Sequence, residues 1–365
     1  MPILSRRAYR YARAWLSGPV DVDEAEVGLV RDGVPVPATL VRPRAAREAL
    51  PAWVVLHGIT RPGRSHPQLA RFTRCLVSTG AVAIVPEVPE WRAVDFAPDL
   101  ASRTVVAALA GLSESGWALD APVAVIGFSF GAPHAIAAST DPDLESCVSH
   151  AVGFGGYCDI EATFRFMMTG AHEWGGRTVR LTPDPYARWL VGANYLARSP
   201  DHADASDVAD ALRALAAHSG DVGAPTHDPV YLPEIARRRA SVAEERQQLF
   251  DLFVPPGWTP IADEPAAHLA ETLADTARRV CPSLDPRPAL ARVRTPTHVL
   301  HGVSDVLIPC SEARKLRDAL PEATRSHLTV TRLFGHTDQD VPSPLRTLGE
   351  APRFARALSR LFATG

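Results

Sequence analysis

Residues 121–139 have the sequence Ala-Pro-Val-Ala-Val-Ile-Gly-Phe-Ser-Phe-Gly-Ala-Pro-His-Ala-Ile-Ala-Ala-Ser. The apolar run 123–126 predicts a buried strand, and the small residues after Gly131 predict a helix. Between them lies the pattern Gly-x-Ser-x-Gly, with Ser129 at its centre. A serine at so sharp a turn needs a strained backbone, and glycines fit where the chain passes close to itself. The stretch therefore predicts a serine hydroxyl presented at the end of a strand.

The composition limits the classes of protein to consider. The chain has 365 residues, of which 46% are hydrophobic and 22% charged, so we expect one large globular domain with an insertion, or two domains. A formal net charge of −3 gives no reason to expect a nucleic-acid partner. No apolar run is long enough to span a membrane. Five scattered cysteines and the lack of a signal-peptide pattern are typical of a reduced, cytoplasmic protein.

Strands and helices alternate through the first part of the chain. The runs 26–32 and 36–42 are joined by Asp32-Gly33 and predict an antiparallel hairpin. Continuous apolar runs are typical of strands buried on both faces. They occur at 52–56, 81–85 and 147–154, with helices predicted at 67–79 and 100–112. This order predicts an α/β fold, a mostly parallel sheet flanked by helices.

The alternation stops after the strand at 147–154 and resumes near residue 293. Between these points the sequence favours helices broken by prolines, at 160–169, 184–197, 204–217, 231–253 and 265–280. The proline-rich stretch 221–233 could be a disordered linker, but good helix formers around it favour an ordered, all-helical insertion. Strands are then predicted at 297–300 and 327–333, and helices at 310–320 and 345–363.

These boundaries suggest four segments. They are an N-terminal helix at 1–25, a first core part at 26–158, a helical cap at 159–292 and a second core part at 293–365. The insertion leaves the sheet at the carboxyl end of a strand, which is the side where open α/β sheets bind ligands. We therefore expect it to cover the site.

Three side chains of complementary chemistry follow three predicted strands. A serine needs a base to act as a nucleophile, and the base needs an orienting carboxylate. Ser129, Asp305 and His336 each come directly after a strand, in the order Ser, Asp, His. They predict a catalytic triad at one edge of the sheet. Asp159, after the strand at 147–154, is the alternative acid.

An acyl-transfer site also needs N–H donors for the oxyanion. One is expected from Phe130, the residue after the nucleophile. The second should come from the loop after the strand at 52–56, where Ile59 and then Thr60 are the candidates.

The motifs together resemble the α/β-hydrolase superfamily, and within it the dienelactone-hydrolase and prolyl-peptidase-like serine esterases. The matching stretches are Val55-Leu56-His57-Gly58, the Gly127–Gly131 turn, His301-Gly302-Val303-Ser304-Asp305 and Phe334-Gly335-His336. The resemblance covers roughly residues 26–157 and 293–363. Dienelactone hydrolases use cysteine, whereas position 129 is serine, so the resemblance implies an esterase.

The sequence therefore predicts a serine hydrolase that cleaves a small-molecule ester. The same triad would also serve an acyltransferase or a peptidase, and a non-catalytic binding protein on this fold is the alternative from another class. No cofactor or metal is expected, because the histidines lack metal-ligand spacing and 153–156 lacks the dinucleotide-binding pattern. The oligomeric state stays open.

Overall fold

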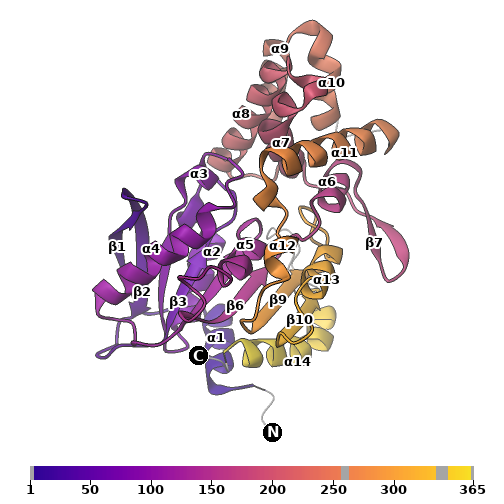
Figure 1. The fold of residues 1–365 in the computed structure, drawn as a ribbon. Coiled ribbons are helices and arrows are strands. Elements are labelled where there is room, and N and C mark those ends of the chain that lie inside the picture. The colour runs from indigo at the N-terminus through magenta and orange to yellow at the C-terminus, as the bar shows by residue number, and fades with distance from the viewer. Residues whose placement is uncertain (1–3, 256–262, 334–343, 363–365) are drawn as a thin grey trace.

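The computed structural model describes residues 4–255, 263–333 and 344–362. Its centre is an eight-stranded sheet in the order β1-β2-β4-β3-β5-β6-β9-β10 (Figure 1). Strand β2 runs antiparallel to both neighbours, and the other neighbouring pairs are parallel. The strands are β1 (Val22–Arg31), β2 (Val34–Pro43), β3 (Ala52–Leu56), β4 (Val82–Pro86), β5 (Val123–Phe128), β6 (Val148–Phe154), β9 (Thr297–Gly302) and β10 (Ser326–Thr331). The predicted α/β fold is confirmed.

The hairpin of β1 and β2 turns at Asp32 and Gly33, as predicted. Both residues have positive φ, 52° and 79°, as a two-residue hairpin turn requires. Strand β1 already begins at Val22, within the range 1–25 that the sequence assigned to an N-terminal segment, so that boundary was placed too late. Polar residues at its start lack the apolar pattern of a buried strand, because β1 is the edge strand.

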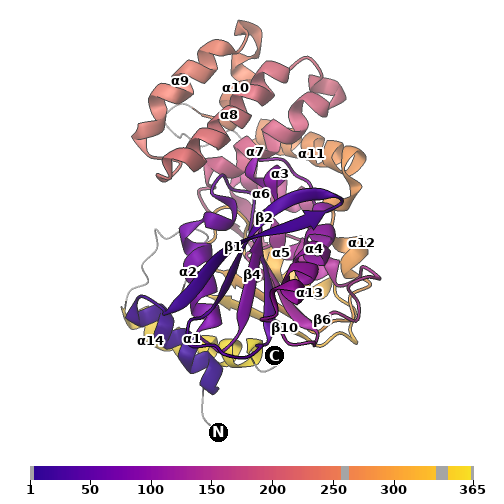
Figure 2. The same cartoon turned by 90° about the vertical axis from the view of Figure 1, so that its left-hand side faces the viewer.

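Helices cover both faces of the sheet, and β3 explains why its sequence is apolar throughout. Trp53 and Val55 pack on the face covered by α1 (Arg6–Ser17), α2 (Pro67–Val77) and α14 (Pro344–Leu361). Val54 and Leu56 point to the other face. That face carries α4 (Leu100–Ser115), α5 (Gly131–Ala138), α12 (Arg287–Leu290) and α13 (Ser311–Asp318). Figure 2 shows α2 on one side of the strands and α4, α5 and α13 on the other.

The insertion stands over one edge of the sheet as a mostly helical cap (Figure 1). The predicted helix at 231–253 is interrupted at Val242, whose backbone is extended. The stretch 221–233 is ordered, because Tyr231 is buried and its hydroxyl donates to the carbonyl of Ala224 (2.7 Å). The cap helices are α6 (Ile160–Thr169), α7 (Pro185–Tyr195), α8 (Ser206–Val222), α9 (Leu232–Ser241), α10 (Gln247–Phe253) and α11 (Asp263–Val280).

The expectation of an all-helical insertion was wrong at one place. Strands β7 (Ala171–Trp174) and β8 (Arg177–Arg180) form a hairpin that projects from the cap (Figure 1). It turns at Gly175 and Gly176, which both have positive φ. Most of its side chains are exposed or half-buried, so the sequence shows no apolar run to mark a strand. In the part of the chain that the structure describes, no helix is long and apolar enough to cross a membrane.

Candidate active site

Ser129 lies at the turn between β5 and α5. Its φ is +52°, a conformation that costs a non-glycine residue energy. Neighbouring backbone holds it there, because its N–H donates to the carbonyl of Phe154 (2.8 Å) and its carbonyl accepts from Ala132 (3.0 Å). The hydrogen bond to β6 and the start of α5 therefore fix a strained serine between strand and helix.

The glycines around Ser129 are required by close contacts. A Cβ on Gly127 would overlap the carbonyl of Gly131, and one on Gly131 would lie 2.6 Å from the carbonyl oxygen of His57. The sequence-based expectation that the chain passes close to itself here is confirmed. A Cβ on Gly58 would lie 3.0 Å from the Cβ of Ser129. The loop after β3 thus lies directly against the serine.

Asp305 follows β9 and is almost completely buried. Its Oδ1 accepts hydrogen bonds from the N–H groups of Leu307 and Ile308, each at 2.9 Å. Its Oδ2 lies 3.2 Å from Nε2 of His301, and this nitrogen also lies 2.9 Å from the carbonyl oxygen of Ile308. The turn and the buried imidazole together fix the orientation of the carboxylate.

Ser129 and Asp305 line one cavity of about 1000 Å³ under the cap. His336, the predicted base, lies outside the described residues. The described chain before it follows β10 to Leu333, which lines the same cavity. The structure therefore brings two of the three predicted triad residues to one cavity.

Asp159, the alternative acid, has a different environment. Its Oδ1 accepts from the N–H groups of Glu161 (3.1 Å) and Ala162 (3.3 Å), so it caps the N-terminus of α6. Burial raises the pKa of this carboxyl, but Lys315, 3.3 Å away, and the N–H of Ala162 outweigh burial and lower it overall. Asp159 is not among the described residues that line the cavity.

Phe130, Ile59 and Thr60, the predicted oxyanion residues, all line the cavity. Phe130 is the residue before the first turn of α5, where N–H groups lack intrahelical partners. Ile59 is buried, and its carbonyl accepts a hydrogen bond from the hydroxyl of Tyr186 in α7 (3.2 Å). A cap side chain thus holds the loop that carries Ile59 and Thr60.

Sequence reasoning missed a buried carboxylate that supports this loop. Glu87 follows β4, and its Oε1 lies 3.0 Å from Nε2 of His57 and accepts from the N–H of Arg64 (3.3 Å). Its Oε2 lies 3.4 Å from Nη1 of Arg92 in α3 (Pro89–Arg92). Its position directly after a parallel strand is the signal that could have revealed it.

A second buried carboxylate fixes the place where the cap leaves the core. Glu312 in α13 is fully buried, and its Oε2 accepts from the N–H groups of Cys158 (3.0 Å) and Asp159 (2.7 Å). Lys315 lies 2.9 Å from its other oxygen. The entry of the cap is therefore anchored by backbone hydrogen bonds to a charged group, which are stronger than neutral ones.

His134 in α5 is structural. Its Nε2 lies 2.7 Å from the hydroxyl of Tyr157, and burial lowers its pKa to about 3. Within the described ranges, no group of three or more His, Cys, Asp or Glu side chains is arranged to hold a metal ion.

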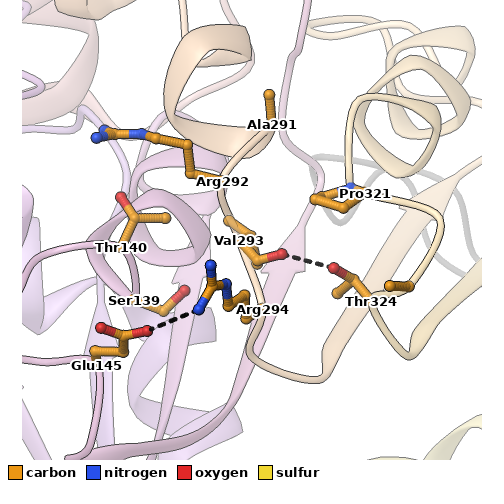
Figure 3. A pocket seen from close by; sticks show the side chains of 10 residues that line it. Ser139, Thr140, Glu145, Ala291, Arg292, Val293, Arg294, Pro321 and Thr324 are labelled. Carbon is orange, nitrogen blue, oxygen red and sulfur yellow. Dashed lines mark hydrogen bonds and ion pairs between the residues drawn. The ribbon is translucent and has the colours of Figure 1, made fainter.

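A second pocket, of about 700 Å³, lies at the opposite edge of the sheet. Figure 3 shows Arg294 and Glu145 at its rim and the hydroxyl of Thr324 bonded to the carbonyl of Val293 (2.6 Å). Arg294 and Glu145 are 4.0 Å apart and both are exposed. The pocket contains none of the predicted site residues.

The chain is similar in structure to several known enzymes. A Pyrococcus horikoshii acylaminoacyl peptidase matches with 10% identity and a TM-score of 0.49, covering 95% of this chain and 41% of that one. One of two fungal esterases from Rhizomucor miehei has 16% identity and a TM-score of 0.49, covering 98% and 90%. Brefeldin A esterase, a bacterial homologue of human hormone sensitive lipase, has 16% identity and a TM-score of 0.47, covering 99% and 89%.

No protein-family model and no curated protein matches the sequence. This chain spans less than half of the acylaminoacyl peptidase but most of the two esterases.

Proposed function

We propose that this chain is a serine hydrolase that cleaves a carboxylic ester or a related acyl bond, with Ser129 as the nucleophile. The observation that carries the proposal is the backbone of Ser129. A strained serine at a strand-to-helix turn, in a cavity that Asp305 also lines, has the presentation a nucleophile needs.

In the proposed mechanism, His336 takes the proton of Ser129 as the hydroxyl attacks the carbonyl carbon. Asp305 orients the imidazole and stabilises its charged form. The N–H of Phe130 and that of Ile59 or Thr60 stabilise the oxyanion. His336 then protonates the leaving group, and water releases the acyl-enzyme. Asp305 is favoured over Asp159 as the acid because it lines the cavity, whereas Asp159 caps α6.

Two other activities would use the same groups. An acyltransferase would replace water by another acceptor, and a peptidase would release an amine. A non-catalytic binding protein would have no use for a strained serine, so the positive φ of Ser129 favours an enzyme.

The proposal is tested with p-nitrophenyl acetate and the Ser129→Ala variant. We expect the wild-type chain to hydrolyse the ester and the variant to lose about 10⁴-fold or more in kcat, as when the nucleophile of other triads is removed. Ser139→Ala is the matched control, because Ser139 is a buried serine just after α5 whose hydroxyl donates to the carbonyl of Ile136 (2.7 Å).

A fluorophosphonate probe gives a second measurement and should label Ser129 in the folded wild-type chain only. Equal turnover by the wild type and Ser129→Ala, or no labelling of folded protein, would favour the binding protein. Faster consumption of the ester with an added alcohol or amine, with acyl product formed, would identify the acyltransferase.

A further inference from the structure

The three helices on one face of the sheet carry a large excess of positive charge. Their sequences contain four arginines in α1, two in α2 and four in α14, against a single acidic residue, Glu350 of α14. The chain as a whole has a net charge of −3. Figures 1 and 2 show α1 and α14 side by side at the end of the molecule away from the cap, and the N–H of Ser5 donates to the hydroxyl of Ser359 (3.0 Å). Positive charge is therefore concentrated at this end.

The arginines of α1 have no acidic partner. Arg6, Arg10 and Arg13 lie on one face of the helix, because they are spaced four and three residues apart. All three are exposed, and none forms an ion pair with the residues that the structure describes. Their charge is therefore available to a partner.

A second group of arginines, on helix α9 of the cap, differs in this respect. Arg237 and Arg238 lie 2.5 Å and 2.7 Å from the carboxylate of Glu234. Arg239 lies 2.8 Å from the carboxylate of Asp251. Their charge is balanced locally, and Figure 1 shows α9 at the opposite end of the molecule from α1.

The cavity that contains Ser129 reaches the surface beside α1. Trp15 and Leu16 of α1 and Arg71 of α2 are among its described lining residues. Leu16 lines the cavity and is nevertheless 85% exposed, so the cavity has an opening at the end of α1. At this opening, Arg71 donates to the carbonyl of Trp15 (2.8 Å) and covers its ring at 4.3 Å.

Exposed apolar side chains lie among the arginines of α1. Tyr9 is 56% exposed, and Tyr9, Arg13 and Leu16 follow one another at spacings of four and three residues, so they share one face of the helix. An anionic lipid bilayer attracts arginines to its headgroups and accepts apolar side chains beneath them. A DNA duplex would match the charges, but it has no apolar layer for Leu16.

We propose that the exposed face of α1, formed by Arg6, Tyr9, Arg10, Arg13 and Leu16, docks on an anionic lipid bilayer. Docking brings the opening of the cavity to the bilayer surface. This partner goes beyond the proposed function, and the docking does not require that function.

The first experiment measures co-sedimentation with phosphatidylcholine vesicles that contain either no phosphatidylserine or about 30% of it. Each arginine near an anionic surface strengthens binding about fivefold, so we expect the wild type to prefer the anionic vesicles by about 100-fold. The triple variant Arg6→Gln, Arg10→Gln and Arg13→Gln should lose this preference. Circular dichroism checks that the variant is folded.

The matched control is the triple variant Arg237→Gln, Arg238→Gln and Arg239→Gln. It removes the same number of charges from an exposed helix, but these charges are paired with acids and lie at the other end of the molecule. It should bind the anionic vesicles within about twofold of the wild type.

The second experiment tests the two components of docking separately. For the wild type alone, raising the NaCl concentration from about 0.05 M to about 0.5 M should weaken binding to anionic vesicles by about tenfold or more. Leu16→Ala should weaken binding to the same vesicles by about fivefold and leave any binding to a short DNA duplex unchanged.

Any of four results would overturn the proposal. They are equal binding to neutral and anionic vesicles, an equal loss of binding in the two triple variants, no effect of salt or of Leu16→Ala, and tighter binding to the DNA duplex than to the anionic vesicles. The proposed function is tested separately by Ser129-dependent hydrolysis of p-nitrophenyl acetate without vesicles, so a failure of either is distinguishable from a failure of the other.

Discussion

The two walls of the cavity are built in different ways. The wall at 127–131 is made by backbone, since a single methyl group on Gly127 would overlap the carbonyl of Gly131. The wall formed by α6 and α7 is made by side chains such as Phe164, Met167 and Ala187. Almost no substitution can be accommodated in the first wall, whereas a single side-chain substitution in the second wall can change the shape of the cavity.

This difference separates two tasks of the molecule. Backbone contacts between β3, β5 and α5 determine where the serine hydroxyl lies. Side chains of the cap determine which group can lie beside it. We therefore expect substitutions in the first wall to affect the fold and those in the second to affect the choice of substrate.

The largest effect is expected from Gly127→Ala. The added Cβ forces β5 away from the start of α5, which should cost about 3 kcal/mol or more of unfolding free energy and most of the activity. Urea unfolding followed by circular dichroism measures the loss. Gly28→Ala is the control, because no heavy atom lies within 4 Å of a Cβ there, and it should stay within about 0.5 kcal/mol. Equal stability of the two variants would show that the backbone wall tolerates change.

Acid should destabilise the core through three buried histidines. Burial lowers the pKa of His134 to about 3, that of His150 to about 4 and that of His298 to about 3. Below pH 6.5 the unfolded chain binds protons that the folded chain does not, so stability falls as the pH falls from 6.5 towards 4. Each histidine contributes at most about 1.4 kcal/mol per pH unit.

Urea unfolding at pH 7.5, 6 and 5 measures this slope. His150→Leu should reduce the slope by about a third, since Nε2 of His150 has no hydrogen-bond partner in the described structure and its ring packs against Trp53. A slope unchanged in the variant would mean that other groups govern the acid response.

The smallest change in the free energy of unfolding is expected from Ser129→Gly, and this variant should be more stable than the wild type rather than less stable. Glycine adopts φ of +52° without strain, so this variant should gain about 1 kcal/mol of stability while losing activity. Ser129→Ala keeps the strain and should not gain. Thermal melts of the two variants make the comparison, and the same melting temperature for both would argue against stored strain at this residue.

Several elements could be predicted from the sequence because local pattern and tertiary role agree. The run Ala52–Leu56 is apolar at every position, and the structure buries both of its faces. The pair Asp32 and Gly33 marked the hairpin turn, since few residue pairs adopt two positive φ values. Ser129 was identified because its turn needs particular glycines.

Other elements left little trace in the sequence. Strands β7 and β8 are short and largely exposed, so neither alternation nor an apolar run marks them. In the sequence, no neighbouring motif distinguishes Glu87 from the other acidic residues. Its role as a buried carboxylate that supports the loop follows from its contacts with His57, Arg64 and Arg92, which come from other parts of the chain. The assignment of His336 as the base is still a prediction.

The sequence by itself determined which backbone conformations the core adopts and which reactive side chains follow its strands, because these depend on neighbours along the chain. The shape and charge of the cavity were decided only by the tertiary structure. Phe96, Phe164 and Ala187 lie far apart in sequence and line one cavity because the cap folds back over β5. Packing between distant segments depends on how whole helices meet, and no local pattern records it.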